Sequence, residues 1–362
     1  MVPSLSLPPM AELKEKQSYY KRVLQILSRF GLDTFILLLI SMILLAYLLP
    51  QGGTGRGTWS LSSLAGYGIS LIFFFYGLKL NFVKLKAGLR NWKLHAVVHI
   101  STFILFPLII LSCKGLFQYT NTYPLWLGAF FLASLPSTVS SSVVMVSIAE
   151  GNIPAAIFNA SISSIIGVFI TPLWMSLVNT GANENADMSG IITKLVLQVL
   201  VPVVLGILLN KKWGWFAEKY KKELKYFDQT IILTIVYTAF CESFAQHMFS
   251  NIGFVELIML GICMVSLFFL AYFIISLISR LLSFNREDTI TASFCGSKKS
   301  LVHGTVMSKV LFANSTMTGI LLLPLMLYHA LQLIIISMIA QKLAKDKHHA
   351  ATIKDPGGAV SV

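Results

Sequence analysis

Two lysines and a run of hydroxyl side chains interrupt apolar stretches of this chain, and they are its most chemically capable residues. Lys298 and Lys299 follow Ser297 and precede Ser300. The hydroxyls come directly after Pro136 and belong to Ser137, Thr138, Ser140, Ser141 and Ser142. An ammonium group binds anions or oxygen atoms as a point charge, and a hydroxyl both donates and accepts hydrogen bonds. These residue types predict binding of a solute or an ion, provided the surrounding elements hold them away from bulk water.

Composition indicates what those elements are. The 362 residues are 56% hydrophobic and 12% charged, with a mean hydropathy of +0.75, whereas about 25% charged is usual in soluble domains. A helix crosses the hydrocarbon with about 20 mainly apolar residues, so the length allows about ten crossings and no separate soluble domain. The net charge of +13 is better explained by membrane topology than by a nucleic-acid partner. We therefore predict an all-α polytopic membrane protein surrounded by lipid.

The apolar runs predict ten spans in a transmembrane domain over residues 31–342. Their approximate ranges are 31–50, 63–81, 93–113, 124–148, 154–178, 191–210, 229–247, 253–281, 289–312 and 317–342. Residues 1–30 form a retained cytoplasmic segment in this scheme, and residues 343–362 form a cytoplasmic tail. Most of the 28 lysines and arginines then fall on one side, as expected of cytoplasmic loops. We expect a multi-pass protein of the cell (inner) membrane with both termini in the cytoplasm.

Spans four and nine share small, polar patches that break their apolar runs, one marked by Pro136 and the other by Gly296. They are five spans apart, and because five is odd the two halves would insert in opposite senses. This arrangement is typical of inverted repeats with a site between discontinuous helices. The repeats would cover about 31–178 and 191–342. Serines also occur in tightly packed membrane helices, which is the structural alternative.

The depth of the two lysines separates two interpretations. If span nine starts near Asp288, the lysines lie about ten residues, or roughly 15 Å, along the helix. A cation there costs at least about 2.5 kcal/mol unless it is paired or solvated. In the alternative, the helix begins only at Ser300 and the lysines cap it at the surface. That would leave about 13 apolar residues before Asn314, too few to cross, so we favour the deep placement.

Further polar residues inside the spans are candidates for the same cavity: Asn159, Ser161, Thr102 and His99. An intramembrane asparagine also commonly bridges helices, and a histidine is often a packing residue, so both alternatives stay open. Asp228 and Glu242 are expected at the surface, with a counter-ion role for the lysines as the alternative. The four cysteines show no metal-ligand spacing, and no P-loop or nucleophile elbow is present, so no metal site and no enzymatic activity are predicted.

The segment 211–225 is strongly basic and contains Trp213, Trp215 and Phe216. Basic residues beside large aromatic side chains are typical of a stretch that lies at the membrane surface against anionic lipid. We expect it to contact membrane lipids.

Several motifs resemble the bile acid:sodium symporter family, within it the branch similar to the seventh vertebrate member and to bacterial sodium-dependent transporters. The resemblance runs from about residue 31 to 340. Its most specific pieces are Gly77-Leu78-Lys79-Leu80, Leu89-Arg90-Asn91-Trp92, Leu135-Pro136-Ser137-Thr138, Gly151-Asn152-Ile153-Pro154-Ala155-Ala156 and Phe294-Cys295-Gly296-Ser297-Lys298-Lys299-Ser300. The resemblance implies ten helices in two inverted five-helix repeats, with broken helices four and nine crossing at the ion sites.

This chain departs from the family pattern at the sodium ligands. The resemblance places the family's Ser-Asn pair of helix four at Ser140 and Ser141, its glutamate at Phe294, and its Gln-Asn pair at Lys298 and Lys299. The carboxylate is absent. We hypothesise that the lysine ammonium groups stand in for one or both sodium ions, or bind an anionic solute directly. A sodium ion is the one cofactor that the resemblance suggests.

The sequence thus predicts a secondary transporter that moves a small organic anion, such as a bile-acid-like or carboxylate solute, by alternating access. Coupling to sodium is left open by the lysines. The alternative is a regulatory membrane protein that affects ion homeostasis without a transport cycle of its own. Neither the substrate nor the direction of transport follows from the sequence.

Overall fold

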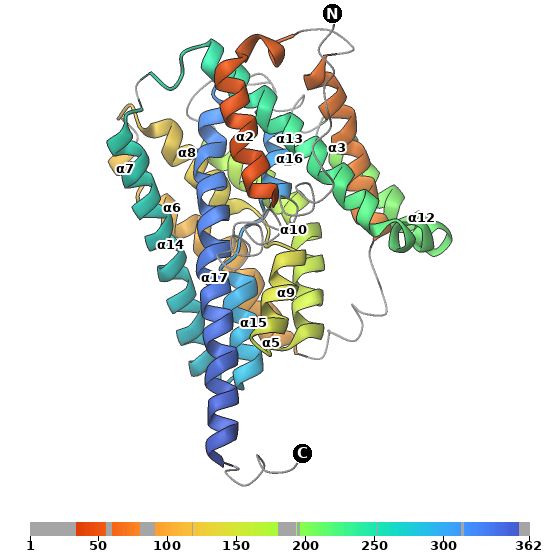
Figure 1. Ribbon diagram of the computed structural model, residues 1–362, viewed down its shortest axis with the longest axis vertical. Coiled ribbons are helices and arrows are strands. Elements are labelled where there is room, and N and C mark those ends of the chain that lie inside the picture. The colour runs from red at the N-terminus through yellow and green to blue at the C-terminus, as the bar shows by residue number, and fades with distance from the viewer. Residues whose placement is uncertain are drawn as a thin grey trace, which may run out of the picture.

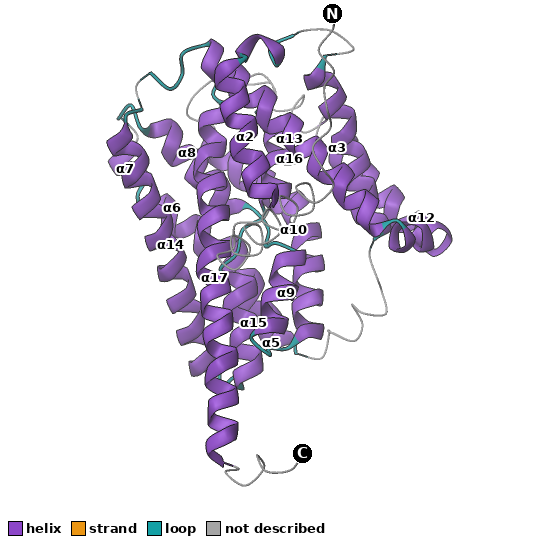
Figure 2. Cartoon of the chain, viewed as in Figure 1, coloured by secondary structure: helices purple, strands orange, loops and turns teal. Residues whose placement is uncertain are grey.

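The computed structural model describes residues 34–55, 60–79, 91–117, 119–179, 193, 196–250, 252–312 and 315–354. The described residues form helices joined by short turns, and none of them lies in a strand (Figure 2). The predicted segment 1–30 and the basic residues Lys84, Lys86 and Arg90 lie outside the described residues. The all-helical prediction is confirmed for the part of the chain that is described.

The helices follow one another as a series of long rods and shorter pieces (Figure 1). In the first half they are α2 (Thr34–Leu48), the 3-10 turn η1 (Pro50–Gly52), α3 (Leu61–Leu78), α5 (Trp92–Ile100), the π-helical turn η2 (Ser101–Leu105), α6 (Phe106–Ser112), α7 (Lys114–Phe117), α8 (Tyr123–Ser134), α9 (Ser140–Ile148) and α10 (Ile153–Asn179). In the second half they are the π-helical turn η3 (Val196–Leu200), α12 (Val201–Lys219), α13 (Lys221–Ala245), α14 (Phe254–Leu281), α15 (Arg286–Gly296), α16 (Leu301–Leu311) and α17 (Thr318–Lys354).

Six described helical stretches are long and apolar enough to cross a membrane. They are Leu61–Leu78, Trp92–Ser112, Ile153–Val178, Val196–Lys219, Phe254–Leu281 and Thr318–Asp346. Two shorter apolar helices, Thr34–Leu48 and Tyr123–Ser134, add to them. Many large apolar side chains on these helices face outward, as a hydrocarbon environment requires. The chain is a multi-pass membrane protein.

Two groups of helices can be followed in Figure 1. In one, α3 lies along α12 and α13 packs against α2 and α3. Gly77 and Gly206 permit the close α3–α12 approach, because a Cβ at either position would collide with a backbone carbonyl of the other helix. In the other group, α5, α8, α9, α10, α14, α15, α16 and α17 surround two helix breaks. The second group contains the residues that the sequence singled out.

Both predicted breaks are present. The chain leaves helical geometry between Ser134 and Ser140 and again between Gly296 and Leu301. Leu135 is extended, with φ −73° and ψ 153°, because the residue before a proline is disfavoured in the helical region. The second broken helix has a separate N-cap for each half: at the start of α15, Asn285 Oδ1 accepts from Asp288 N (2.8 Å), and at the start of α16, Ser300 Oγ accepts from His303 N (3.3 Å).

A polar cluster on the first turns of α5, α10 and α15 holds these helices together. Asp288 is buried, and its carboxylate accepts hydrogen bonds from the side-chain amides of Asn91 and Asn152. Each asparagine also caps its own helix, since Asn91 Oδ1 accepts from Leu94 N and Asn152 Oδ1 accepts from Ala155 N. This cluster anchors the start of α15, the helix that leads into the second break.

The last helix is longer than the predicted span. The hydrophobic pattern predicted an end near residue 342, but α17 continues to Lys354. The extension carries Lys345 and Asp346, both exposed, so it projects beyond the other helices as a polar rod (Figure 1).

Candidate solute and ion site

The two helix breaks cross and hydrogen-bond to each other. Ser300 N donates to the carbonyl oxygen of Pro136 (2.9 Å), and Ser137 Oγ donates to the carbonyl oxygen of Cys295 (2.6 Å). All four residues are buried or nearly so. Interrupted backbone inside a membrane protein requires such partners, because lipid offers none. The crossing therefore places the hydroxyl-rich and lysine-bearing segments side by side.

Lys299 is fully buried, and its ammonium group lies among backbone oxygens. Nζ donates to the carbonyl oxygens of Thr102 (2.6 Å), Ala133 (2.6 Å) and Leu135 (2.9 Å). These three acceptors match the three donors of an ammonium group. The face of the Phe106 ring adds a cation–π contact, with its centroid 4.3 Å from Nζ.

Two of these acceptors are available to Lys299 because α8 ends at the first break. The last carbonyls of a helix have no intrahelical donor. At this break other helices supply the donors: Ala133 O and Leu135 O accept from Lys299 Nζ, Ser134 O accepts from Thr171 Oγ1 (2.8 Å), and Pro136 O accepts from Ser300 N. Ser137 N donates to Ser163 Oγ (2.9 Å). These five backbone groups of the break are thus paired by residues of other helices.

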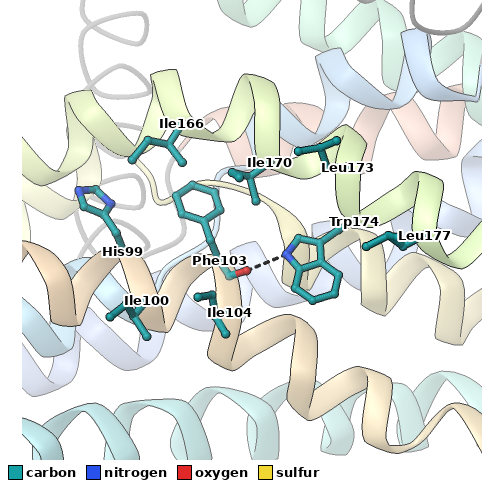
Figure 3. A pocket seen from close by; sticks show the side chains of 9 residues that line it. All are labelled: His99, Ile100, Phe103, Ile104, Ile166, Ile170, Leu173, Trp174 and Leu177. Carbon is teal, nitrogen blue, oxygen red and sulfur yellow. Dashed lines mark hydrogen bonds between the residues drawn. The ribbon is translucent and has the colours of Figure 1, made fainter.

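The third acceptor comes from the π-helical turn η2. In this turn Phe106 N donates to Ser101 O, five residues back. The next donor in the series would be the N–H of residue 107, but Pro107 has none. The carbonyls of Thr102 and Phe103 are therefore directed to side chains: Thr102 O accepts from Lys299, and Phe103 O accepts from Trp174 Nε1 (2.7 Å, Figure 3). π-Helical turns are frequent at functional sites.

Lys298 has a different environment from its neighbour. It is also fully buried, and its Nζ donates to Ser141 Oγ (2.8 Å). Ser141 Oγ donates to Thr138 Oγ1 (2.9 Å), which lies 2.8 Å from Ser142 Oγ. Four predicted site residues thus form one hydrogen-bonded chain from the second break to α9. The side chain of Ser140 lies outside the described residues.

The second break is held from α17 by two residues that the sequence did not suggest. Gln332 pairs with the backbone of Lys299, accepting from its N–H (2.8 Å) and donating to its carbonyl (2.8 Å). Tyr328 OH donates to the carbonyl oxygen of Ser297 (2.7 Å). The one signal in the sequence is that both are polar residues inside the most hydrophobic part of the last span. Ser163, in span five, could have been found in the same way.

The remaining predicted site residues contact their own helices or other elements. Ser297 Oγ donates to Ser293 O (2.6 Å), and Ser161 Oγ donates to Ile157 O (2.9 Å). Asn159 bridges helices, with Oδ1 3.1 Å from His95 Nδ1 and Nδ2 donating to Ala155 O. Thr102 serves the site through its carbonyl rather than its hydroxyl. None of these contacts excludes a role in binding, which stays a prediction.

His99 faces away from the crossing. It lines an apolar groove of about 410 Å³ between α5–η2 and α10, together with Phe103, Ile166 and Trp174 (Figure 3). Both ring nitrogens are buried, and neither has a hydrogen-bond partner among the described residues. Through Phe103 and Trp174, the groove borders the π-helical turn that supplies one carbonyl to Lys299.

Asp228 does not contact the lysines of the crossing. Its Oδ2 pairs with Lys79 Nζ at 3.1 Å, joining α13 to the end of α3. Within the described part of the chain, no carboxylate lies within 4.0 Å of Lys298 or Lys299. Among the described residues, carbonyl oxygens and the Phe106 ring contact Lys299 Nζ, and the Ser141 hydroxyl contacts Lys298 Nζ.

This combination of apolar helices, crossed breaks and buried cations defines a membrane transporter, and comparison with known proteins agrees. The chain belongs to the SBF-like CPA transporter family, whose model matches residues 33–345. The family resemblance seen in the motifs is thereby confirmed.

Three relatives illustrate the range of similar proteins. "Uncharacterized protein PA2026" of Pseudomonas aeruginosa is 40% identical over 89% of this chain and 96% of its own length. "Putative symporter YfeH" of Escherichia coli is 37% identical over 86% and 92%, respectively. "Sodium/bile acid cotransporter 7" of Xenopus tropicalis is 30% identical over 87% and 92%.

Proposed function

We propose that this protein is a secondary transporter of ten transmembrane helices in two inverted repeats, which moves a small organic anion by alternating access. In this proposal Lys298 and Lys299 replace coupling sodium ions at the crossing of the broken helices. The observation that carries the proposal is the set of three carbonyl oxygens around Lys299 Nζ. The inner-membrane location and the cytoplasmic orientation of both termini are part of the same proposal.

The surroundings of Lys299 resemble a site for a dehydrated monovalent cation. Backbone carbonyls replace the hydration shell of such ions in selectivity filters. Here the three oxygens come from η2 and from the end of α8, and the ammonium sits 2.6 to 2.9 Å from each. A tethered ammonium at this point would take the place of such an ion, so the two breaks would need no separate ion to pair them.

Lys298 supplies the contact with solute. An ammonium group has three donors, and among the described residues Ser141 Oγ takes one of them. A carboxylate on the solute would satisfy the others and balance a buried charge that has no acidic partner there. The adjoining hydroxyls of Thr138 and Ser142 can bind polar groups of the solute, in line with the bile acid in the name of the Xenopus relative.

Uptake into proteoliposomes tests the proposal. Purified protein is supplied with radiolabelled taurocholate and a panel of mono- and dicarboxylates, with and without an inward sodium gradient. We expect saturable uptake of at least one anion that a sodium gradient changes less than twofold, and loss of that uptake in Lys298→Ala. The exposed Lys342→Ala is the matched control and should transport normally.

Two outcomes would contradict the proposal. A steep sodium requirement that survives in Lys298→Ala would show that the lysines do not replace the coupling ion. Absence of uptake across the panel, together with unchanged thermal stability on addition of every anion, would favour the regulatory role.

A further inference from the structure

The corner where α12 meets α13 has a strongly basic outer side. We define the basic corner as residues 211–226. Its exposed cations are Lys211, Lys212, Lys219, Lys221, Lys222 and Lys225, and its exposed acids are Glu218 and Glu223. The chain reverses direction within the corner, at Tyr220. Positive charge is therefore concentrated on one projecting corner of the molecule, the green region labelled α12 in Figure 1.

The inner side of the basic corner is fixed to α3. Ala217 and Leu224 are buried in a small apolar cluster with Leu78. Asn210 Nδ2 donates to the carbonyl oxygen of Leu78 (2.6 Å), and Lys79 pairs with Asp228 just beyond the corner. The lysines are thus presented by a rigid platform rather than by a loose loop.

Exposed aromatic side chains accompany the lysines. Trp213, Trp215 and Tyr226 are 48%, 64% and 57% exposed. Lys219 Nζ lies 6.0 Å from the centroid of the Trp215 ring and 5.4 Å from that of Tyr220. Tryptophan and tyrosine are enriched at the level of lipid headgroups. The apolar stretch Val196–Lys219 runs directly into the corner, so the corner lies at the end of a membrane span.

We infer that the basic corner binds the phosphate headgroups of anionic phospholipids. Charge complementarity favours this partner, because six exposed cations outnumber two exposed acids in the basic corner. The exposed aromatic rings favour a position at the membrane interface. Each lysine near an anionic surface strengthens binding about fivefold, and the effect falls off within a Debye length. The inference concerns a surface remote from the helix crossing and does not depend on the transported solute.

The test measures quenching of tryptophan fluorescence by brominated lipids around the full-length protein in nanodiscs. Brominated phosphatidylglycerol is compared with brominated phosphatidylcholine at equal mole fraction. The part of the quenching that is lost in the double variant Trp213→Phe/Trp215→Phe is assigned to the basic corner. We expect that quenching to be at least twofold stronger with phosphatidylglycerol, and the preference to disappear in Lys211→Gln/Lys212→Gln/Lys219→Gln.

A variant with the same loss of charge elsewhere provides the control. Lys93→Gln/Lys342→Gln/Lys345→Gln removes three exposed lysines outside the corner and should keep the preference. Equal quenching by both lipids in the unmodified protein would overturn the inference, and so would equal loss of preference in the two triple variants. Inorganic phosphate that abolishes the preference at an ionic strength where sodium chloride does not would also overturn it, since the site would then take a soluble anion.

Discussion

The two helix breaks differ in what they offer each other. The break between α8 and α9 presents mainly acceptors, namely the carbonyls of Ala133, Leu135 and Pro136, and it donates once, from Ser137 Oγ to Cys295 O. The break between α15 and α16 presents donors, namely the ammonium of Lys299 and the N–H of Ser300. The comparison teaches that most of the hydrogen bonds between the two segments run from the second break to the first. Variants that remove a donor from one side should therefore be costlier than variants that remove a redundant hydroxyl.

Removal of the Lys299 ammonium should break the pairing most severely. Lys299→Ala removes the donor of three buried carbonyls, and each buried group left unpaired costs about 1–3 kcal/mol. We expect a large drop in melting temperature in detergent, partly restored by 150 mM sodium chloride but not by choline chloride. Lys342→Ala should melt like the unmodified protein. A Lys299→Ala protein with unchanged melting would refute the assigned role of the ammonium.

Loss of the two hydrogen bonds from Gln332 of α17 to the backbone of Lys299 should have the second-largest effect on stability. Gln332→Leu removes both hydrogen bonds to the backbone of Lys299, and each buried group left unpaired costs about 1–3 kcal/mol. The melting temperature should fall, by less than in Lys299→Ala. Gln332→Glu keeps the acceptor for Lys299 N, so its melting temperature should lie between those of the unmodified protein and Gln332→Leu. If Gln332→Leu and Gln332→Glu were equally stable, the hydrogen bond that residue 332 accepts from Lys299 N would contribute nothing to stability.

The contact between Lys298 and Ser141 should show a smaller, pairwise effect. A double-mutant cycle with Lys298→Ala and Ser141→Ala is expected to give a coupling free energy of about 1.5 kcal/mol, because the hydrogen bond involves a charged donor. The free energies come from equilibrium unfolding in detergent. Additive single variants would mean that the two groups do not interact in solution.

The smallest effect separates hydroxyls at the crossing from hydroxyls on a helix surface. Ser137→Ala removes the hydrogen bond to Cys295 O in the opposite break and should cost about 1 kcal/mol. Ser161→Ala removes a bond within its own helix and should leave melting unchanged. Equal melting temperatures would show that the Ser137 hydroxyl does not join the two breaks.

Local signals fixed the position of the breaks and the depth of the lysines. Pro136 disfavours helical geometry at Leu135, which is extended, and the apolar run before Ser297 carries the lysines away from the surface. Sequence could also identify Ser137, Thr138, Ser141 and Ser142 as a cluster, because residues within five positions of one another along the chain stay close in space. It could not rank Asn159, His99 or the hydroxyl of Thr102, whose partners depend on which helix packs beside them.

The amino-acid sequence by itself determined the membrane class, the all-helical fold, the two interruptions and the family. Only the tertiary structure decided that Lys299 meets backbone carbonyls while Lys298 meets a hydroxyl. The reason is that these partners are far apart along the chain: Lys299 reaches Thr102 across a separation of 197 residues. Every residue type also has a backbone carbonyl, so no pattern of side chains could have predicted which carbonyls surround the ammonium of Lys299.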